Sequence, residues 1–168
     1  MKKLVVKGKV WKYGNNIDTD AIIPGKYMSL KSLEEQKPHT MEGVDPSFAK
    51  KVQAGDIIVA GRNFGCGSSR ETAATLIKAC GISAIIAESF SRIFFRNAIN
   101  QALLLVECEG IVDVVEEGDI LEYDSSSGRI TNTTQAVQLN ATSLPDFLLE
   151  ILQDGGAIEN FRKRHRSV

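Results

Sequence analysis

A run of small and polar residues, GRNFGCGSSRE at residues 61–71, carries the clearest chemical signal in the sequence. Its glycines leave the backbone bare, Ser68 and Ser69 supply hydroxyls, and Arg70 supplies a guanidinium. An apolar segment precedes the run and an alanine-rich segment follows it, so we expect a strand to end here and a helix to begin. Free N–H groups and the helix dipole favour an anion at such a position. The predicted guest is a carboxylate or a phosphate.

Common nucleotide-binding and hydrolase motifs partly match this stretch, but none matches it fully. The dinucleotide-binding pattern Gly-x-Gly-x-x-Gly has its first two glycines at Gly65 and Gly67 but meets Arg70 at the third position. No Gly-Lys-Ser/Thr follows, which excludes a P-loop, and neither serine lies in Gly-x-Ser-x-Gly, which speaks against an α/β-hydrolase. A purely structural alternative stays open, because Ser68 and Glu71 have the spacing of a helix capping box, with Arg70 on the surface of the first turn.

The elements around this stretch alternate between short apolar strands and helices. Strands are expected at residues 4–14, 56–61, 83–89 and 103–107, with helices at 68–81 and 90–103. Continuous apolar strands joined by helices indicate parallel pairing with right-handed crossovers. The predicted fold is an α/β single domain over residues 1–168, with a βαβαβ parallel core. The glycine-rich stretch then lies at the carboxyl end of a strand, where open α/β sheets bind ligands.

Further elements are expected on either side of this core. A short helix is predicted at 46–55, and short antiparallel strands flank the turn DSSSG at 124–128. A helix at 143–156 should begin with a serine cap at Ser143 and pack on the sheet through the apolar positions Leu144, Phe147, Leu148, Ile151 and Leu152.

Two polar segments are expected at the surface. Residues 29–45 read as the least ordered segment, and residues 26–42, interrupted by Pro38, are predicted to form a mobile loop beside the site. The basic run RKRHR at 162–166 reads as a solvated helix end.

Composition restricts the class of protein. The chain has 168 residues, of which 43% are hydrophobic and 24% charged, as in ordinary globular domains. A formal net charge of -1 gives no field that would recruit nucleic acid or an anionic membrane. No apolar run approaches the roughly 20 residues of a membrane span, and Lys7 and Lys9 interrupt any signal-peptide core. The odd number of cysteines fits a reducing compartment, so a cytoplasmic location is expected.

Three stretches together resemble a known family: NIDTDAIIPGKY at 16–27, GDIIVAGRNFGCGSSRE at 55–71 and SFSRIFFRNAINQALLLVE at 89–107. They are similar to the small subunits of 3-isopropylmalate dehydratase, which are detached counterparts of the swivelling domain of aconitase. The resemblance implies a hydro-lyase of leucine biosynthesis that moves a hydroxyl between adjacent carbons by removing and re-adding water. It also implies a large subunit, in a heterodimer or heterotetramer, that carries a [4Fe–4S] cluster with one open iron.

The resemblance also implies roles for individual residues. It places the catalytic serine at Ser68, its paired acid at Asp20, and substrate-binding residues at Gly67, Ser69, Arg70, Tyr27 and Ser29. The proton removed lies next to a carboxylate and is weakly acidic, so the base must approach an alkoxide. One strong N–H donor to an oxyanion contributes about 3–4 kcal/mol, and an arginine grips a carboxylate with two hydrogen bonds.

One departure from the family bears on the substrate. Aconitase-type sites carry a further arginine after the first loop, and two-subunit homoaconitases often read Tyr-Leu-Arg-Thr there. This chain reads Tyr27-Met28-Ser29-Leu30, with Lys26 and Lys31 as the nearest cations. The missing arginine favours an apolar branch over a third carboxylate. Isopropylmalate fits, and dimethylmalate or another alkylmalate fits equally. A related hydro-lyase such as homoaconitase, or a non-catalytic carboxylate-binding module, stays open as an alternative.

The three cysteines offer a different reading, in which this chain ligates a cluster itself. Cys66, Cys80 and Cys108 lack the close Cys-x2-Cys spacing of usual cluster sites. Cys80 and Cys108 are expected as small buried residues at the ends of elements, and Cys66 is expected to line the site. No metal ligand is therefore predicted on this chain.

Overall fold

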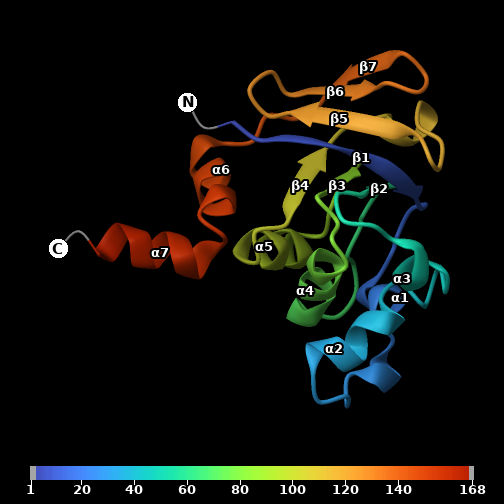
Figure 1. Ribbon diagram of the computed structural model, residues 1–168, viewed down its shortest axis with the longest axis vertical. Coiled ribbons are helices and arrows are strands. Elements are labelled where there is room, and N and C mark those ends of the chain that lie inside the picture. Colours follow the sequence, from blue (N-terminus) through green and yellow to red (C-terminus); the bar gives the residue numbers. More distant parts are fainter. Residues whose placement is uncertain (1–2, 167–168) are drawn as a thin grey trace.

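The computed structural model describes residues 3–166 and contains one seven-stranded sheet in the order β4-β3-β2-β1-β5-β6-β7 (Figure 1). Its parallel half consists of β1 (Val5–Lys12), β2 (Ile57–Ala60), β3 (Ala84–Ala87) and β4 (Leu104–Glu107). Each of these strands pairs in parallel with its neighbour. The predicted α/β class and parallel core are confirmed.

Two helices cover one face of the parallel strands. They are α4 (Glu71–Ala79) and α5 (Arg92–Asn100), and each follows a strand of the core. Side chains from both helices pack with Ile58 and Ile85 in one apolar cluster. Val59 and Ile86 belong to a second cluster on the opposite face, so both faces of the strands are buried. This burial explains why these strands are continuously apolar and do not alternate.

The antiparallel half of the sheet covers that second face. It consists of β5 (Ile120–Asp124), β6 (Arg129–Asn132) and β7 (Val137–Asn140), and β5 pairs antiparallel with β1. The sheet curls so that these strands lie above the parallel ones in Figure 1. Leu121 and Tyr123 of β5 point into the second cluster. The predicted antiparallel strands around residues 124–128 are confirmed.

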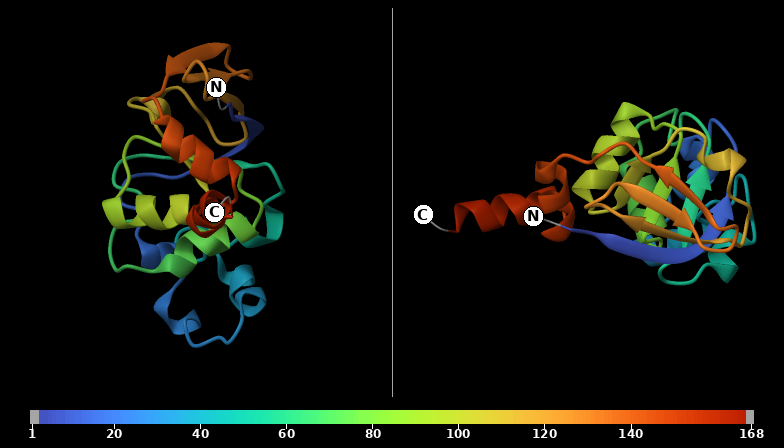
Figure 2. Two further views of the ribbon diagram at one scale, coloured as in Figure 1. Left: turned by 90° about the vertical axis from the view of Figure 1, so that its left-hand side faces the viewer. Right: turned by 90° about the horizontal axis from the view of Figure 1, so that it is seen from above.

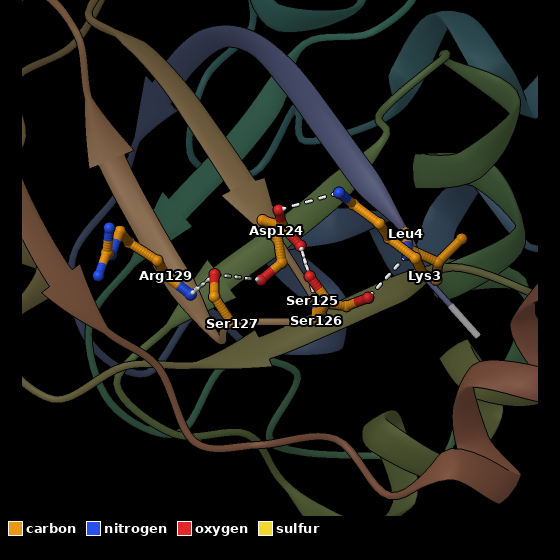
Figure 3. Close-up of polar contacts among 7 residues, drawn as sticks. All are labelled: Lys3, Leu4, Asp124, Ser125, Ser126, Ser127 and Arg129. Carbon is orange, nitrogen blue, oxygen red and sulfur yellow. Dashed lines mark hydrogen bonds and ion pairs between the residues drawn. The ribbon is translucent and has the colours of Figure 1, made fainter. Parts of the chain in front are cut away.

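The turn between β5 and β6 also ties down the start of the chain (Figure 3). The Ser125 hydroxyl accepts a hydrogen bond from the Leu4 N–H at 2.7 Å, and the Leu4 carbonyl accepts one from the Ser125 N–H at 2.9 Å. Asp124 accepts hydrogen bonds from the Ser126 N–H and hydroxyl and pairs with Lys3 at 3.4 Å. The serine-rich turn therefore holds Lys3 and Leu4, which lead into β1, in place.

Short helical pieces fill the connection between β1 and β2: α1 (Thr19–Ile22), η1 (Gly25–Tyr27), α2 (Leu33–Gln36), η2 (Lys37–His39) and α3 (Phe48–Lys51). The helix predicted at 46–55 is present as α3 but is shorter, since Val52 is already extended. Residues 29–45 are more regular than their composition indicates, because Gln36, Thr40 and Met41 are buried and hold the helical turns in place.

The C-terminal region corrects two predictions. Helix α6 spans Asp146–Gln153, so Ser143 lies outside it, and Pro145 takes the position before the first turn with no side-chain cap. The predicted apolar stripe packs on the sheet at Leu144, Leu148, Ile151 and Leu152. It is wrong at Phe147, whose exposed fraction is 58%, while the unpredicted Leu149 is buried.

A further helix, α7 (Ala157–His165), follows α6 and projects from the body (Figure 2). The basic run occupies its exposed last turn, as predicted. Ion pairs join Lys163 to Asp154 at 2.9 Å and Arg164 to Glu150 at 3.2 Å, and so tie α7 to α6. Among the helices of residues 3–166, none combines the length and apolar character that a membrane crossing needs.

Candidate active site

The glycine-rich stretch lies against the segment that leads into α1. The Gly65 N–H donates to the Ile17 carbonyl at 2.7 Å, and the Thr19 N–H donates to the Cys66 carbonyl at 2.9 Å. The Thr19 hydroxyl adds a third hydrogen bond, to the Ser68 carbonyl at 2.9 Å. These contacts bring two segments about 50 residues apart in the sequence side by side and place Ser68 next to the helix that carries Asp20.

Two glycines of the stretch have different jobs. Gly65 has φ +82°, and a Cβ built on it would lie 2.2 Å from Cγ of Phe94, so close packing excludes any side chain. Gly67 has φ +92°, but its nearest neighbour would be 3.5 Å from a built Cβ, and the residue is exposed. Gly65 therefore serves packing, whereas Gly67 presents bare backbone to the solvent.

The capping-box alternative is wrong. Helix α4 begins at Glu71, and Arg70 takes the cap position with an extended backbone and no side-chain cap hydrogen bond. The Glu71 carboxylate accepts a hydrogen bond from the Gln101 side chain at 3.1 Å and does not reach back to Ser68. Ser68 lies outside the helix, and its side chain is exposed.

The backbone amides around Ser68 are available to a ligand. Within residues 3–166, the N–H groups from Gly67 to Thr72 find no acceptor, and the first to find one is that of Ala73, which donates to the Arg70 carbonyl at 3.1 Å. Such a series of free donors at the start of a helix binds anions. The predicted anion site thus has its donors in place.

Arg70 and Asp20 form a pair at the edge of this site. Arg70 Nη1 donates to Asp20 Oδ1 at 3.2 Å and to the Ile23 carbonyl at 2.8 Å. The Gly25 N–H donates to the same Asp20 oxygen at 2.9 Å. The Gly25 N–H and the Arg70 guanidinium hold the pKa of Asp20 below its usual range. Asp20 is therefore ionised at neutral pH and orients Arg70.

A narrow hollow, too small to hold a water molecule, lies beside Ser68. One wall consists of Thr19, Gly65 and the backbone and side chains of residues 67–70, and the other belongs to Ile93, Phe94 and Asn97 of α5. The α5 residues are functional candidates that the sequence reasoning did not name. They follow β3, the neighbouring parallel strand, and ligand sites gather at the carboxyl ends of such strands. That rule could have found them.

The structure brings together most, but not all, of the predicted site residues. Asp20 and the residues from Gly67 to Arg70 are joined by the contacts above. Tyr27 and Ser29 lie on the neighbouring loop and do not line the hollow. The Tyr27 hydroxyl donates to Glu42 Oε1 at 2.8 Å, and the Ser29 hydroxyl faces the Lys26 carbonyl at 3.4 Å.

The cysteines do not form a cluster site. Cys80 packs in the apolar cluster beneath α4, Cys108 packs in the cluster on the opposite face, and Cys66 lies in the glycine-rich loop. Burial raises the pKa of all three thiols, which disfavours the thiolate that binds iron. In the described part of the chain, no group of three or more His, Cys, Asp or Glu side chains has the arrangement of a metal site.

Known proteins resemble this chain over nearly its whole length. Residues 3–110 match the aconitase C-terminal domain family. The small subunit of the isopropylmalate/citramalate isomerase of Methanocaldococcus jannaschii is 52% identical over 95% of both chains. A 3-isopropylmalate dehydratase small subunit of Thermodesulfovibrio yellowstonii is also 52% identical over 95% of both chains.

A solved structure agrees with these relatives. The crystal structure of a 3-isopropylmalate dehydratase from Methanocaldococcus jannaschii superposes with a TM-score of 0.92 at 44% sequence identity, and it covers 98% of this chain and 97% of its own. At this identity and coverage, the shared features include the sequence as well as the backbone fold.

Proposed function

The chain belongs to the aconitase C-terminal domain family, and we propose that it is the small subunit of a 3-isopropylmalate dehydratase. With a larger partner subunit it would act as a hydro-lyase that interconverts 2-isopropylmalate and 3-isopropylmalate in leucine biosynthesis. Relatives of about half identity over nearly the full chain carry this name and support the assignment. The observation that carries the proposal is Ser68 itself, which is exposed, caps no helix and lies among free backbone amides.

Ser68 is proposed as the base that takes the proton next to the substrate carboxylate. A serine hydroxyl is far too weak a base unless its alkoxide is stabilised. The free N–H groups from Gly67 to Thr72 supply fixed donors for that negative charge without any rearrangement during the reaction. The same proton can then be returned from Ser68 when water adds back at the adjacent carbon.

Arg70 is proposed to bind a substrate carboxylate, with Ser69 and the amide of Gly67 beside it. Its Nη1 is already held by Asp20 and the Ile23 carbonyl, which fixes the plane of the guanidinium. The remaining N–H groups of Arg70 can then take a carboxylate in the two-pronged manner that a lysine cannot reproduce. Asp20 thus acts next to the reacting groups by fixing the cation that binds substrate.

The cysteines of this chain do not fit an iron–sulfur cluster, so the proposal places the [4Fe–4S] cluster on the larger subunit. When bound there, a cluster with one open iron would supply a Lewis acid for the hydroxyl that leaves. The free cysteines of this chain and such a partner both support a cytoplasmic location.

The test is to coexpress the chain with its large subunit under anaerobic conditions, purify the complex and assay a series of malates. Conversion of 2-isopropylmalate to 3-isopropylmalate by the complex, and by neither subunit alone, is the expected result. A higher kcat/KM for dimethylmalate or citramalate would identify that alkylmalate as the substrate and leave the class of reaction unchanged. Binding of malates without turnover by any complex would support the non-catalytic alternative and overturn the proposal.

A further inference from the structure

Three side chains of the loop after Asp20 form a closed unit outside the hollow: Tyr27, His39 and Glu42. The Tyr27 hydroxyl donates to Glu42 Oε1 at 2.8 Å, and His39 Nδ1 lies 2.7 Å from Glu42 Oε2. The two rings stack with their centroids 3.7 Å apart and an interplanar angle of 10°. Each oxygen of the carboxylate thus holds one ring, and the rings hold each other.

The carboxylate of this unit is fixed to the body of the protein. The residues on either side of Glu42 pair with α1, because the Met41 N–H donates to the Ile22 carbonyl at 2.6 Å and the Gly43 N–H donates to the Ala21 carbonyl at 3.0 Å. Met41 is fully buried, and a Cβ on Gly43 would lie 2.6 Å from Cα of Ala21. The backbone at Glu42 is therefore fixed against α1, the helix that carries Asp20.

The other end of the unit, Tyr27, lies at the start of an exposed turn. Residues 27–30 are closed by the Leu30 N–H, which donates to the Tyr27 carbonyl at 3.1 Å, while Met28 and Ser29 are exposed. The turn begins next to the proposed carboxylate site, since a Cβ built on Gly25 would lie 3.5 Å from Nη2 of Arg70. The Tyr27 side chain links this turn to Glu42 and His39, and the Tyr27 carbonyl accepts a hydrogen bond from the side chain of the buried Gln36 at 3.4 Å.

We propose that Glu42 and His39 are positioning residues that hold Tyr27, and with it the turn of residues 27–30, beside Arg70, and that they thereby set the selectivity of the enzyme for the branch of its substrate. The inference rests on the proposed function. The turn offers the apolar side chains of Met28 and Leu30 and no arginine, and the neighbouring Lys26 lies over the Tyr27 ring, 5.1 Å from its centroid. This surface suits an alkyl branch better than a third carboxylate. Neither positioning residue takes part in proton transfer at Ser68.

The kinetic test uses the two-subunit enzyme with Glu42→Ala, Tyr27→Phe and the double variant. For 2-isopropylmalate, the KM of Glu42→Ala should rise about tenfold while kcat stays within about twofold, since binding is lost and the chemical step is not. The rise should be smaller for a malate with a shorter branch, so selectivity falls. The double variant should be no worse than Glu42→Ala, because both break the same contact. Glu34→Ala, an exposed acid on α2 of the same segment, is the matched control and should change neither constant.

A conservative variant and a direct readout complete the test. Glu42→Gln keeps an acceptor for the Tyr27 hydroxyl and should recover part of the lost affinity. In the isolated full chain, Glu42→Ala should speed amide exchange across residues 25–31 and leave α4 unchanged. Unaltered exchange there, or a kcat loss that is equal for every substrate, would overturn the positioning role. An inactive wild-type complex would instead overturn the proposed function, and the exchange data would still decide whether Glu42 holds the turn.

Discussion

At the scale of single residues, the central question is what the Ser68 hydroxyl does. Helix caps account for many serines in Ser-x-x-Glu sequences. Here the helix begins three residues later, and the Ser68 carbonyl, not its hydroxyl, is the atom bound by Thr19. The side chain therefore has no structural task in the described part of the chain, which separates its effect on turnover from its effect on stability.

Ser68→Ala in the assembled enzyme should lower kcat about 10²–10⁴-fold, the usual contribution of a general base, with a small change in KM. Loss of a cap would instead cost about 1 kcal/mol and lower Tm by about 2–4 °C in a domain of this size. On the catalytic reading we expect Tm to fall by less than about 2 °C. Turnover and thermal melting measured on the same variant decide between them, with Ser143→Ala, an exposed serine outside the site, as control. Near-normal turnover with a lowered Tm would contradict the catalytic role.

The two glycines of the site give a matched pair for stability. Gly65→Ala combines a left-handed backbone with a direct clash against Phe94, and should destabilise the fold by roughly 3 kcal/mol or more. Gly67→Ala has the same kind of backbone but open space, and should cost about 1–2 kcal/mol. Urea unfolding of both variants measures the difference. Equal losses would show that the packing against Phe94 can relax.

At the scale of elements, the carboxylates of Asp20 and Glu42 hold the connection between β1 and β2 together through hydrogen bonds. Protonating them at low pH should therefore loosen this connection. Partners of Asp20 and Glu42, the Gly25 N–H with Arg70 and the Tyr27 hydroxyl with His39, hold both pKa values below the usual range. A carboxyl group whose folded pKa is depressed stabilises the fold fully above its ordinary pKa of about 4, and this stabilisation is lost as pH falls through the folded pKa.

The amide resonances of Gly25 and Tyr27, followed by NMR on a falling pH scale, should therefore stay constant down to about pH 4 and change below it. Asp20→Asn should remove most of the change at Gly25, and Glu42→Gln most of that at Tyr27. A transition already complete above about pH 5 would contradict the depressed pKa values. Whether residues 26–42 move over substrate stays a prediction, and exchange rates in the free and bound subunit would test it.

The C-terminal helix presents an apolar side that contributes nothing to the core. Ile158 and Phe161 of α7 are 68% and 62% exposed. Replacing both with serine should change the free energy of unfolding by no more than about 0.5 kcal/mol each, as for other surface positions. Leu149→Ala in α6, at 3% exposure, is the contrasting control and should cost about 2–5 kcal/mol. A comparable loss for the α7 variant in urea would show that this helix packs on the body.

These elements also show what the sequence can and cannot predict. The parallel strands were predictable because burial on both faces leaves a continuous apolar run, as in Ile57–Ala60. The start of α6 was misjudged because Pro145 fixes the chain next to the first turn, further along than Ser143. The contacts between residues 17–19 and the glycine-rich loop use backbone groups apart from the Thr19 hydroxyl, and backbone groups leave no pattern of residue types. The apparent capping box was a local signal overridden by that contact.

At the scale of the whole molecule, the candidate site is half of an enclosure. Gly67, Ser68 and Ser69 are exposed to solvent, and the hollow beside them is too narrow to enclose a substrate. In open water a serine alkoxide would be strongly solvated and protonated by water. The proposed chemistry therefore needs a second surface that excludes water. The larger subunit implied by the relatives is the natural source of that surface.

Placing the [4Fe–4S] cluster on the larger subunit predicts that the isolated chain holds no cluster. A [4Fe–4S] site needs several thiolates within reach of one another, whereas Cys80 and Cys108 lie on opposite faces of the sheet. Anaerobic incubation with iron and sulfide, followed by desalting, should leave iron well below one equivalent and no visible charge-transfer absorbance. Cys66→Ser is the control, since any adventitious iron should involve the most accessible thiol and disappear with it. A stable, stoichiometric cluster on the wild-type chain would contradict the placement of the cluster on the partner.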